Sequence, residues 1–162
     1  MRIESPDTDA ADRIADLWVR LAEDQQQHGS HLKSEANRED ITENITRSIV
    51  GDGLRVARAE ADDDVESGTV LGFVMFTIDI GPFETDVTRG TIENIYVEPE
   101  YRNQGVGAAL LSAAEDALGE RGADVVKLEV MGNNEDARRF YRGRGYEPHR
   151  VQLEKPIESD ND

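Results

Sequence analysis

Apolar residues recur every three or four positions in two stretches near the start of the chain, which is the spacing of an amphipathic helix. The first helix should bury Ile14, Leu17, Trp18 and Leu21. The second should begin at about residue 34 and bury Ile41, Ile45 and Ile49. Polar residues 7–9 can cap the first helix, residues 25–30 form a loop between the two, and glycines within 51–53 end the second. Ahead of both helices, residues 2–4 can form a short strand.

The next part of the chain changes to β-branched and aromatic residues, which favour strands. Residues 54–60 and 69–79 predict two strands, and the acidic, glycine-bearing residues 61–68 between them predict an antiparallel hairpin. After a polar loop that opens at Gly81, residues 91–97 predict another strand. Its alternation places Ile92, Asn94 and Tyr96 on one face and Glu93 on the other.

Helical spacing returns from about residue 104 to residue 121, and Gly122 closes this third helix. Its packing stripe is Val106, Leu110, Ala113, Ala114 and Ala117. Residues 125–130 predict a strand, 134–142 a short helix and 146–153 a last strand. The element order β-α-α-β-β-β-α-β-α-β therefore predicts one α/β (α+β) domain over residues 1–156, with a mixed sheet of six to seven strands and four helices. Residues 157–162 form an acidic tail that is expected to fray.

The charge of the chain restricts its partners. With 18 basic against 35 acidic residues, the formal net charge is -17, so the protein should repel nucleic acids and anionic membranes. Carboxylates spread along the whole sequence suit a salt-rich cytoplasm, and the alternative is an acidic patch that attracts polyamines or other cations. With neither an apolar span nor a leader pattern at the start, we expect a soluble cytoplasmic protein.

The same composition restricts the chemistry. The sequence contains no cysteine, which excludes disulfides, thiolate metal sites and a cysteine nucleophile. Its carboxylates lack the paired spacing of metal ligands, so no metal is expected.

A glycine-bearing turn lies between the strand at 91–97 and the following helix. Backbone N–H groups and the positive end of the helix dipole can converge there on an anion, and glycines at 105 and 107 would let a pyrophosphate approach the backbone. The alternative is a turn whose glycines serve only capping or packing. No lysine or hydroxyl residue directly follows Gly107, so the turn is not a P-loop, and it lacks the third glycine of the dinucleotide-binding motif.

Two segments resemble motifs of the GCN5-related N-acetyltransferase (GNAT) superfamily. The turn reads Arg102-x-x-Gly105-x-Gly107, similar to the family's Arg/Gln-x-x-Gly-x-Gly/Ala. The stretch 134–146 is similar to its Asn-x-x-Ala-x-x-Phe-Tyr segment. The resemblance implies a GNAT-like domain that uses acetyl-CoA as co-substrate to acetylate an amine.

In that family acetyl-CoA lies between two splayed parallel strands, which here would be residues 91–97 and 125–130. The turn would hold the pyrophosphate, and main-chain groups of the first strand would pair with the pantetheine arm. The cofactor-binding residues that the resemblance implies are Ile95, Tyr96, Val97, Arg102, Asn103, Gln104, Gly105, Val106, Gly107, Ala108, Asn134, Ala137 and Tyr141.

Two residues are candidates for catalysis. An alkyl ammonium must lose a proton before it attacks a thioester, and Glu93, beside the expected acetyl position, is the candidate acceptor of that proton. Alternatively, Glu93 only binds a cationic substrate or lies on a solvated face. Tyr141 matches the family position of the acid that protonates the departing thiolate, and its alternative is a packing role beside Ala137 and Phe140.

Further assignments stay open at this level. The arginines 138, 139, 142 and 144 could meet the 3′-phosphate of CoA or form a solvated helix face. His28 and His31 lie where the family contacts acceptors, or are ordinary surface residues. The favoured acceptor is a small primary amine, with a protein N-terminus or lysine side chain as the alternative, and a CoA-binding regulatory module without turnover as a third reading. A homodimer is plausible by family habit.

Overall fold

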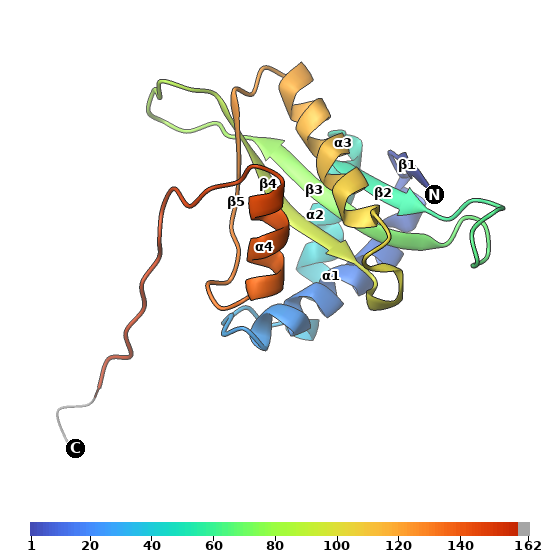
Figure 1. The fold of residues 1–162 in the computed structure, drawn as a ribbon, viewed down its shortest axis with the longest axis horizontal. Coiled ribbons are helices and arrows are strands. Elements are labelled where there is room, and N and C mark those ends of the chain that lie inside the picture. Colours follow the sequence, from blue (N-terminus) through green and yellow to red (C-terminus); the bar gives the residue numbers. More distant parts are fainter. Residues whose placement is uncertain (159–162) are drawn as a thin grey trace. The chain divides into compact units, whose positions relative to one another are not determined.

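The computed structural model describes residues 1–158. Its internal contacts divide the chain into two compact units, Met1–Met131 and the segment from Gly132 onward. The first unit holds the sheet and three α-helices, and the second holds one further helix (Figure 1).

The sheet of the first unit has five strands in the order β1-β2-β3-β4-β5 within the described residues. Their bounds are β1 Arg2–Glu4, β2 Leu54–Arg58, β3 Val70–Ile78, β4 Arg89–Val97 and β5 Val125–Leu128. The first four strands pair antiparallel, as the predicted hairpin requires, and β4 pairs parallel with β5. The helices are α1 Ala11–Gln26, α2 Arg38–Val50 and α3 Val106–Glu120.

Helices cover both faces of this sheet: α3 lies on one, and α1 with α2 on the other (Figure 1). The core beneath α1 and α2 confirms the predicted helix faces, because Ile14, Leu17, Trp18 and Ile45 are buried in it together with Tyr96 of β4. On the opposite face Gly90 lies so close to α3 that a Cβ there would come within 2.7 Å of the Leu118 side chain.

A β-bulge in β4 changes the face that its residues occupy. Met75 pairs with Asn94 and Phe76 with Ile92, so Glu93 is an extra residue without a partner in β3. Before the bulge, Ile92 shares the α3 face with Gly90, whereas Asn94 contacts Met75 of the core under α1. The predicted alternation, with Ile92, Asn94 and Tyr96 on one face, is therefore wrong, because one inserted residue reverses the phase of the pleat.

The third helix buries more than its predicted stripe. It starts at Val106, and both Leu111 and Leu118 are fully buried in addition to Leu110. The helix is apolar around much of its circumference, so spacing alone selected too narrow a face. Gly122, at φ +94°, follows its C-terminal end as predicted.

The second unit contains α4, Glu135–Gly143. Asn134 caps it, since its side-chain oxygen accepts the Ala137 N–H at 3.2 Å. The Tyr141 ring packs edge to face against Phe140 and Tyr146, with centroids 5.3 and 5.9 Å away.

The strand predicted at residues 146–153 is wrong, because no strand forms between α4 and residue 158. A strand needs a neighbour for its N–H and C=O groups, Pro148 contributes no N–H, and the side chains of Val151 and Leu153 are 77% and 88% exposed. The observed order is β-α-α-β-β-β-α-β-α, with five described strands in place of six to seven. Of the predicted tail, residues 157 and 158 are exposed and 159–162 lie outside the described residues.

Within residues 1–158, none of the helices combines the length and the apolar character that crossing a lipid bilayer requires.

Candidate active site

The parallel pairing of β4 with β5 stops halfway along β4. The ladder runs from Arg89 opposite Val125 to Ile92 opposite Leu128, while β4 continues to Val97 beside β3 alone. In an antiparallel pair, alternate residues direct both main-chain polar groups away from the partner strand. Beyond Ile92, the N–H and C=O groups of β4 that point away from β3 therefore have no hydrogen-bonded strand opposite them within the described residues. The family resemblance implies a splayed parallel pair at residues 91–97 and 125–130, and the structure pairs β4 in parallel with a shorter β5 that ends at Leu128.

The turn after β4 presents uncapped backbone N–H groups at the start of α3. Asn103 (φ +62°) and Gly105 (φ +85°) both adopt left-handed conformations, and Gly105 is the N-cap of the helix. No side chain of residues 1–158 caps the helix, and its first turn has no acidic residue. The first N–H groups of a helix lack intrahelical acceptors and carry the positive end of its dipole, so this turn can bind an anion.

Gly105 leaves open space at the turn. A Cβ at this position would meet no atom of the described chain within 4 Å, so packing within the protein does not require glycine there. The positive φ does favour glycine, and the open side lets a ligand approach the backbone. The turn therefore fits the pyrophosphate that the sequence predicts at residues 102–108.

Two predicted cofactor-binding side chains at the turn contact the protein itself. The Arg102 Nε donates to the Val97 carbonyl at 2.8 Å, its Nη2 lies 3.3 Å from the Asp24 carboxylate, and its guanidinium stacks 5.3 Å from the Tyr96 ring centroid. The Gln104 amide donates to the Glu100 carbonyl at 3.3 Å.

The candidate base Glu93 is the extra residue of the β4 bulge and is exposed to solvent. Partial desolvation of its carboxylate raises its pKa, and the negative charge of Asp79 adds to the effect. A carboxylate with a raised pKa is a stronger base, which suits the role predicted for Glu93.

Asp79 follows β3 and was not identified as a site residue from the sequence, where it only ends a predicted strand. The Thr91 hydroxyl donates to its carboxylate, and the Lys127 ammonium lies 3.3 Å away. Desolvation alone would raise the pKa of Asp79, but hydrogen bonds from Thr91 and Lys127, with the charges of Lys127 and Arg89, hold that pKa below its ordinary value. Asp79 therefore stays ionised beside Glu93, and two carboxylates in one neighbourhood have opposite pKa shifts.

Tyr141 and Asn134 belong to the second unit. Burial raises the pKa of Tyr141 to about 12, so its hydroxyl remains protonated at neutral pH and can donate a proton or a hydrogen bond. Its ring contacts with Phe140 and Tyr146 also satisfy the packing alternative. The Asn134 side chain and the Ala137 N–H, both predicted to contact the cofactor, bond to each other.

Three arginines in and just after α4 have partners within the second unit. Arg138 donates to the Gly132 carbonyl at 2.8 Å, Arg139 lies 3.4 Å from Asp136, and Arg144 stacks on the Phe140 ring. These contacts favour the solvated-face reading for the three residues over a 3′-phosphate site.

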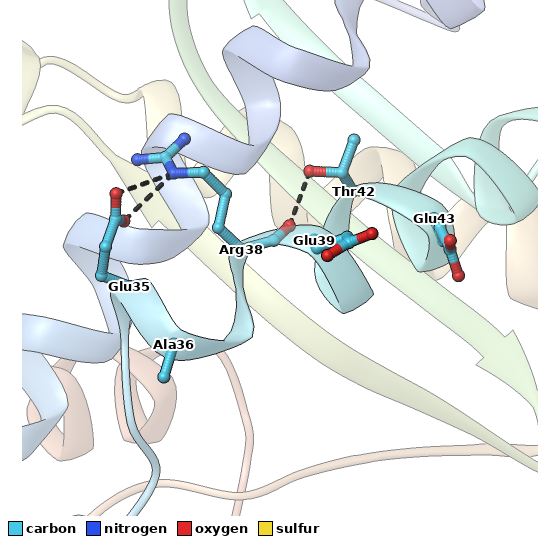
Figure 2. A pocket seen from close by; sticks show the side chains of 6 residues that line it. All are labelled: Glu35, Ala36, Arg38, Glu39, Thr42 and Glu43. Atoms are coloured by element: carbon cyan, nitrogen blue, oxygen red, sulfur yellow. Dashed lines mark hydrogen bonds and ion pairs between the residues drawn. The ribbon is translucent and has the colours of Figure 1, made fainter.

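A shallow hollow of about 520 Å³ lies at the start of α2, apart from the predicted site residues. It is lined by Glu35, Ala36, Arg38, Glu39, Thr42 and Glu43 (Figure 2). Arg38 approaches both Glu35 carboxylate oxygens at 3.0 Å and therefore partly neutralises the hollow. Its remaining carboxylates favour cations over anions but define no ligand. His28 and His31 lie in the connection between α1 and α2.

Within residues 1–158, no group of three or more His, Cys, Asp or Glu side chains could hold a metal ion.

An interrupted parallel strand pair, followed by a glycine turn and an uncapped helix, defines an α/β protein that can hold a phosphate-bearing co-substrate against a sheet edge. The model of the acetyltransferase (GNAT) family matches residues 16–146. The chain belongs to this family, whose co-substrate is acetyl-CoA, and the resemblance read from the two motifs is confirmed.

Similar proteins agree with this assignment. The uncharacterised N-acetyltransferase YhfO of Bacillus subtilis (strain 168) is 34% identical over 85 residues, covering 51% of this chain and 54% of that protein. The ribosomal protein bS18-alanine N-acetyltransferase of Escherichia coli (strain K12) is 41% identical over 56 residues, 35% of this chain and 38% of that enzyme. This chain therefore spans about half the length, or less, of the curated relatives it matches.

Solved structures share the fold over nearly the whole chain. A tetramutant of the BH1408 protein from Bacillus halodurans superposes with a TM-score of 0.77 at 17% identity, covering 97% of this chain and all of that one. A putative acetyl transferase from Pyrococcus furiosus gives a TM-score of 0.66 at 27% identity, covering 96% of this chain and 99% of that one.

Proposed function

We propose that this protein transfers the acetyl group of acetyl-CoA to the nitrogen of a primary amine, with a small-molecule amine as the favoured acceptor. One observation carries the proposal: an uncapped helix N-terminus with Gly105 at φ +85° follows a strand whose parallel partner ends early. Backbone donors at residues 103–108 would hold the pyrophosphate, and the edge of β4 at Ile95 to Val97 would pair with the pantetheine arm. When bound, acetyl-CoA supplies the thioester.

Glu93 is proposed to take a proton from the acceptor's ammonium group, directly or through one water, so that the neutral amine can attack the thioester carbonyl. Its raised pKa makes it a stronger base than an ordinary surface glutamate at the same pH. Asp79, which its partners hold ionised, favours proton uptake by Glu93 through its negative charge.

Tyr141 is proposed to donate its hydroxyl proton, or a hydrogen bond, to the departing sulfur. With a pKa of about 12 the phenol is protonated throughout the working range, as this role requires.

A protein N-terminus is the second candidate acceptor. Support comes from the 41% identity over 56 residues to the enzyme named ribosomal protein bS18-alanine N-acetyltransferase. A regulatory module without turnover is the third. The presence of both Glu93 and Tyr141 disfavours it, because a module that only binds CoA needs neither a proton acceptor nor a proton donor.

The deciding experiment is a screen for CoA release from acetyl-CoA, at high salt, with single amines, polyamines, amino acids and N-terminal peptides. The matched control is Glu93→Gln, which keeps the shape of the side chain and removes its basicity. Turnover with an amine that falls at least tenfold in the variant supports the proposal. Equal rates for both proteins would discard Glu93 as the base, whereas no turnover with any amine, or CoA release without acetylated product, would contradict the proposed activity.

A cytoplasmic location and a homodimer stay predictions. Sedimentation of the full chain at high salt measures the oligomeric state directly.

A further inference from the structure

Helix α1 contacts the segment between β4 and the glycine turn through two ion pairs. The helix contributes the cation to one pair and the anion to the other. Arg20 of α1 pairs with Glu98, and Asp24 of α1 pairs with Arg102. Arg20 and Asp24 stand one helical turn apart on the same side of α1, and Glu98 and Arg102 stand at the two ends of the short 3-10 helix Pro99–Tyr101. Each end of this segment is therefore held by one charge of α1.

The first contact, between Arg20 and Glu98, is buried at its Glu98 end. The Glu98 side chain is only 6% exposed, and its Oε1 also lies 3.7 Å from an Arg13 nitrogen, so two arginines of α1 serve one carboxylate. The Glu98 N–H donates to the Leu71 carbonyl of β3 at 3.0 Å, and its own carbonyl accepts the Tyr101 N–H at 2.9 Å. Glu98 thus joins the sheet, α1 and the start of the turn, and a buried charge so bonded has one well-defined position.

The second contact is one of several that Arg102 makes with the protein. Its N–H donates to the Pro99 carbonyl at 3.3 Å, its Nε to the Val97 carbonyl at 2.8 Å, and its Nη2 approaches Asp24. The guanidinium also stacks on the ring of Tyr96. These contacts bend the chain back on itself immediately before Asn103, whose left-handed conformation begins the glycine turn.

We propose that α1 presets the pyrophosphate-binding turn through the Arg20–Glu98 and Asp24–Arg102 contacts, so that Glu98 and Arg102 are positioning residues and not cofactor ligands. The inference rests on the proposed function, because it assigns the turn to acetyl-CoA. It changes the role that the family resemblance gives Arg102, from binding the cofactor to fixing the conformation of the backbone that binds it.

The two roles of Arg102 predict opposite effects of removing Asp24. If Arg102 binds phosphate, Asp24 competes for the guanidinium, and Asp24→Ala leaves CoA affinity unchanged or increases it. If Arg102 acts by holding the turn, Asp24→Ala weakens CoA binding by about threefold to fivefold, the effect of one largely exposed ion pair. Arg102→Ala, which loses the Val97 and Tyr96 contacts as well, should weaken it by about tenfold or more.

The experiment measures CoA affinity by titration calorimetry at one fixed salt concentration for the wild type, Asp24→Ala, Arg102→Ala and the double variant. We expect the double variant to match Arg102→Ala within about twofold, because residues in one contact are not additive. The control is Asp16→Ala. It removes a carboxylate of α1 that is 47% exposed, against 45% for Asp24, and that pairs with Arg38 on α2 instead of with the turn.

The expected result is a loss of affinity in Asp24→Ala and not in Asp16→Ala, with equal melting temperatures for these two variants. Asp24→Glu should recover part of the loss, since its carboxylate can still reach Arg102. Unchanged or tighter CoA binding by Asp24→Ala would overturn the inference, and so would equal losses in both variants. A wild type that does not bind CoA would overturn the proposed function together with it, whereas wild-type binding that Asp24→Ala leaves intact overturns the inference alone.

Discussion

Replacing Gly105 with alanine adds one methyl group, which should affect the stability of the fold and the affinity for CoA to different extents. Gly105 has φ +85°, and its Cβ would point into space that no described atom occupies within 4 Å. The folded chain therefore pays only for the left-handed conformation of an L-residue, about 1–2 kcal/mol. For a chain of this size that lowers the melting temperature by about 2–8 °C.

The effect on CoA should be larger than this strain explains. A Cβ on the open side of the turn keeps the pyrophosphate from the backbone, and losing one hydrogen bond to a charged group costs about 1.5–3 kcal/mol. That loss corresponds to roughly a tenfold to hundredfold weaker Kd for CoA. Titration calorimetry with CoA measures it without an acceptor.

Gly122→Ala is the matched control, at the opposite end of α3. Gly122 has φ +94°, and its Cβ would likewise meet nothing within 4 Å. We expect the same thermal destabilisation as in Gly105→Ala but wild-type affinity for CoA. If the two variants bind CoA equally well, the turn does not hold the pyrophosphate and the reasoning fails.

Three further predictions concern ionisable groups. Glu93→Gln should abolish the acid limb of the pH–rate profile, and an unchanged profile would discard Glu93 as base. The variant should also have a slightly higher melting temperature at neutral pH, because a carboxylate with a raised pKa destabilises the fold above that pKa. Tyr141→Phe should lower kcat at least tenfold and CoA affinity much less, and equal turnover would leave Tyr141 a packing residue. Desolvation alone would raise the pKa of Asp52, but Arg55 and Arg121 outweigh it and lower that pKa. Ionised Asp52 therefore stabilises the fold above the ordinary aspartate pKa, and this stabilisation is lost as the pH falls through the lowered pKa. Asp52→Asn should therefore cost up to about 1 kcal/mol at neutral pH, less at high salt and nothing at strongly acidic pH, in urea titrations; a deficit that persists in acid would contradict this.

The cations near Glu93 affect the two carboxylates of this neighbourhood differently. Lys127 compensates Asp79 at 3.3 Å but makes no recorded contact with Glu93. One carboxylate is thereby held ionised and the other is left with a raised pKa. The raised pKa destabilises the fold at neutral pH, a cost commonly found at functional sites.

The sequence alone determined the features that depend on a few neighbouring residues. The spacing of Ile14, Leu17 and Trp18 predicted a helix face that is buried, and the residues around Gly105 predicted a glycine turn and the helix after it. Such features follow from side-chain periodicity and from the φ preference of glycine, which act within one or two turns of chain. Two short motifs at the correct separation were also enough to indicate the family.

Only the tertiary structure decided the features that join distant residues. The bulge at Glu93 arises from the register of β4 against β3, and Arg102 meets Asp24 although 78 positions separate them. The segment at residues 146–153 has the composition of a strand and forms none, because a strand exists only where a neighbour accepts its hydrogen bonds. Local pattern sets what each segment can become, but pairing register and long-range charge contacts set which groups meet at the site.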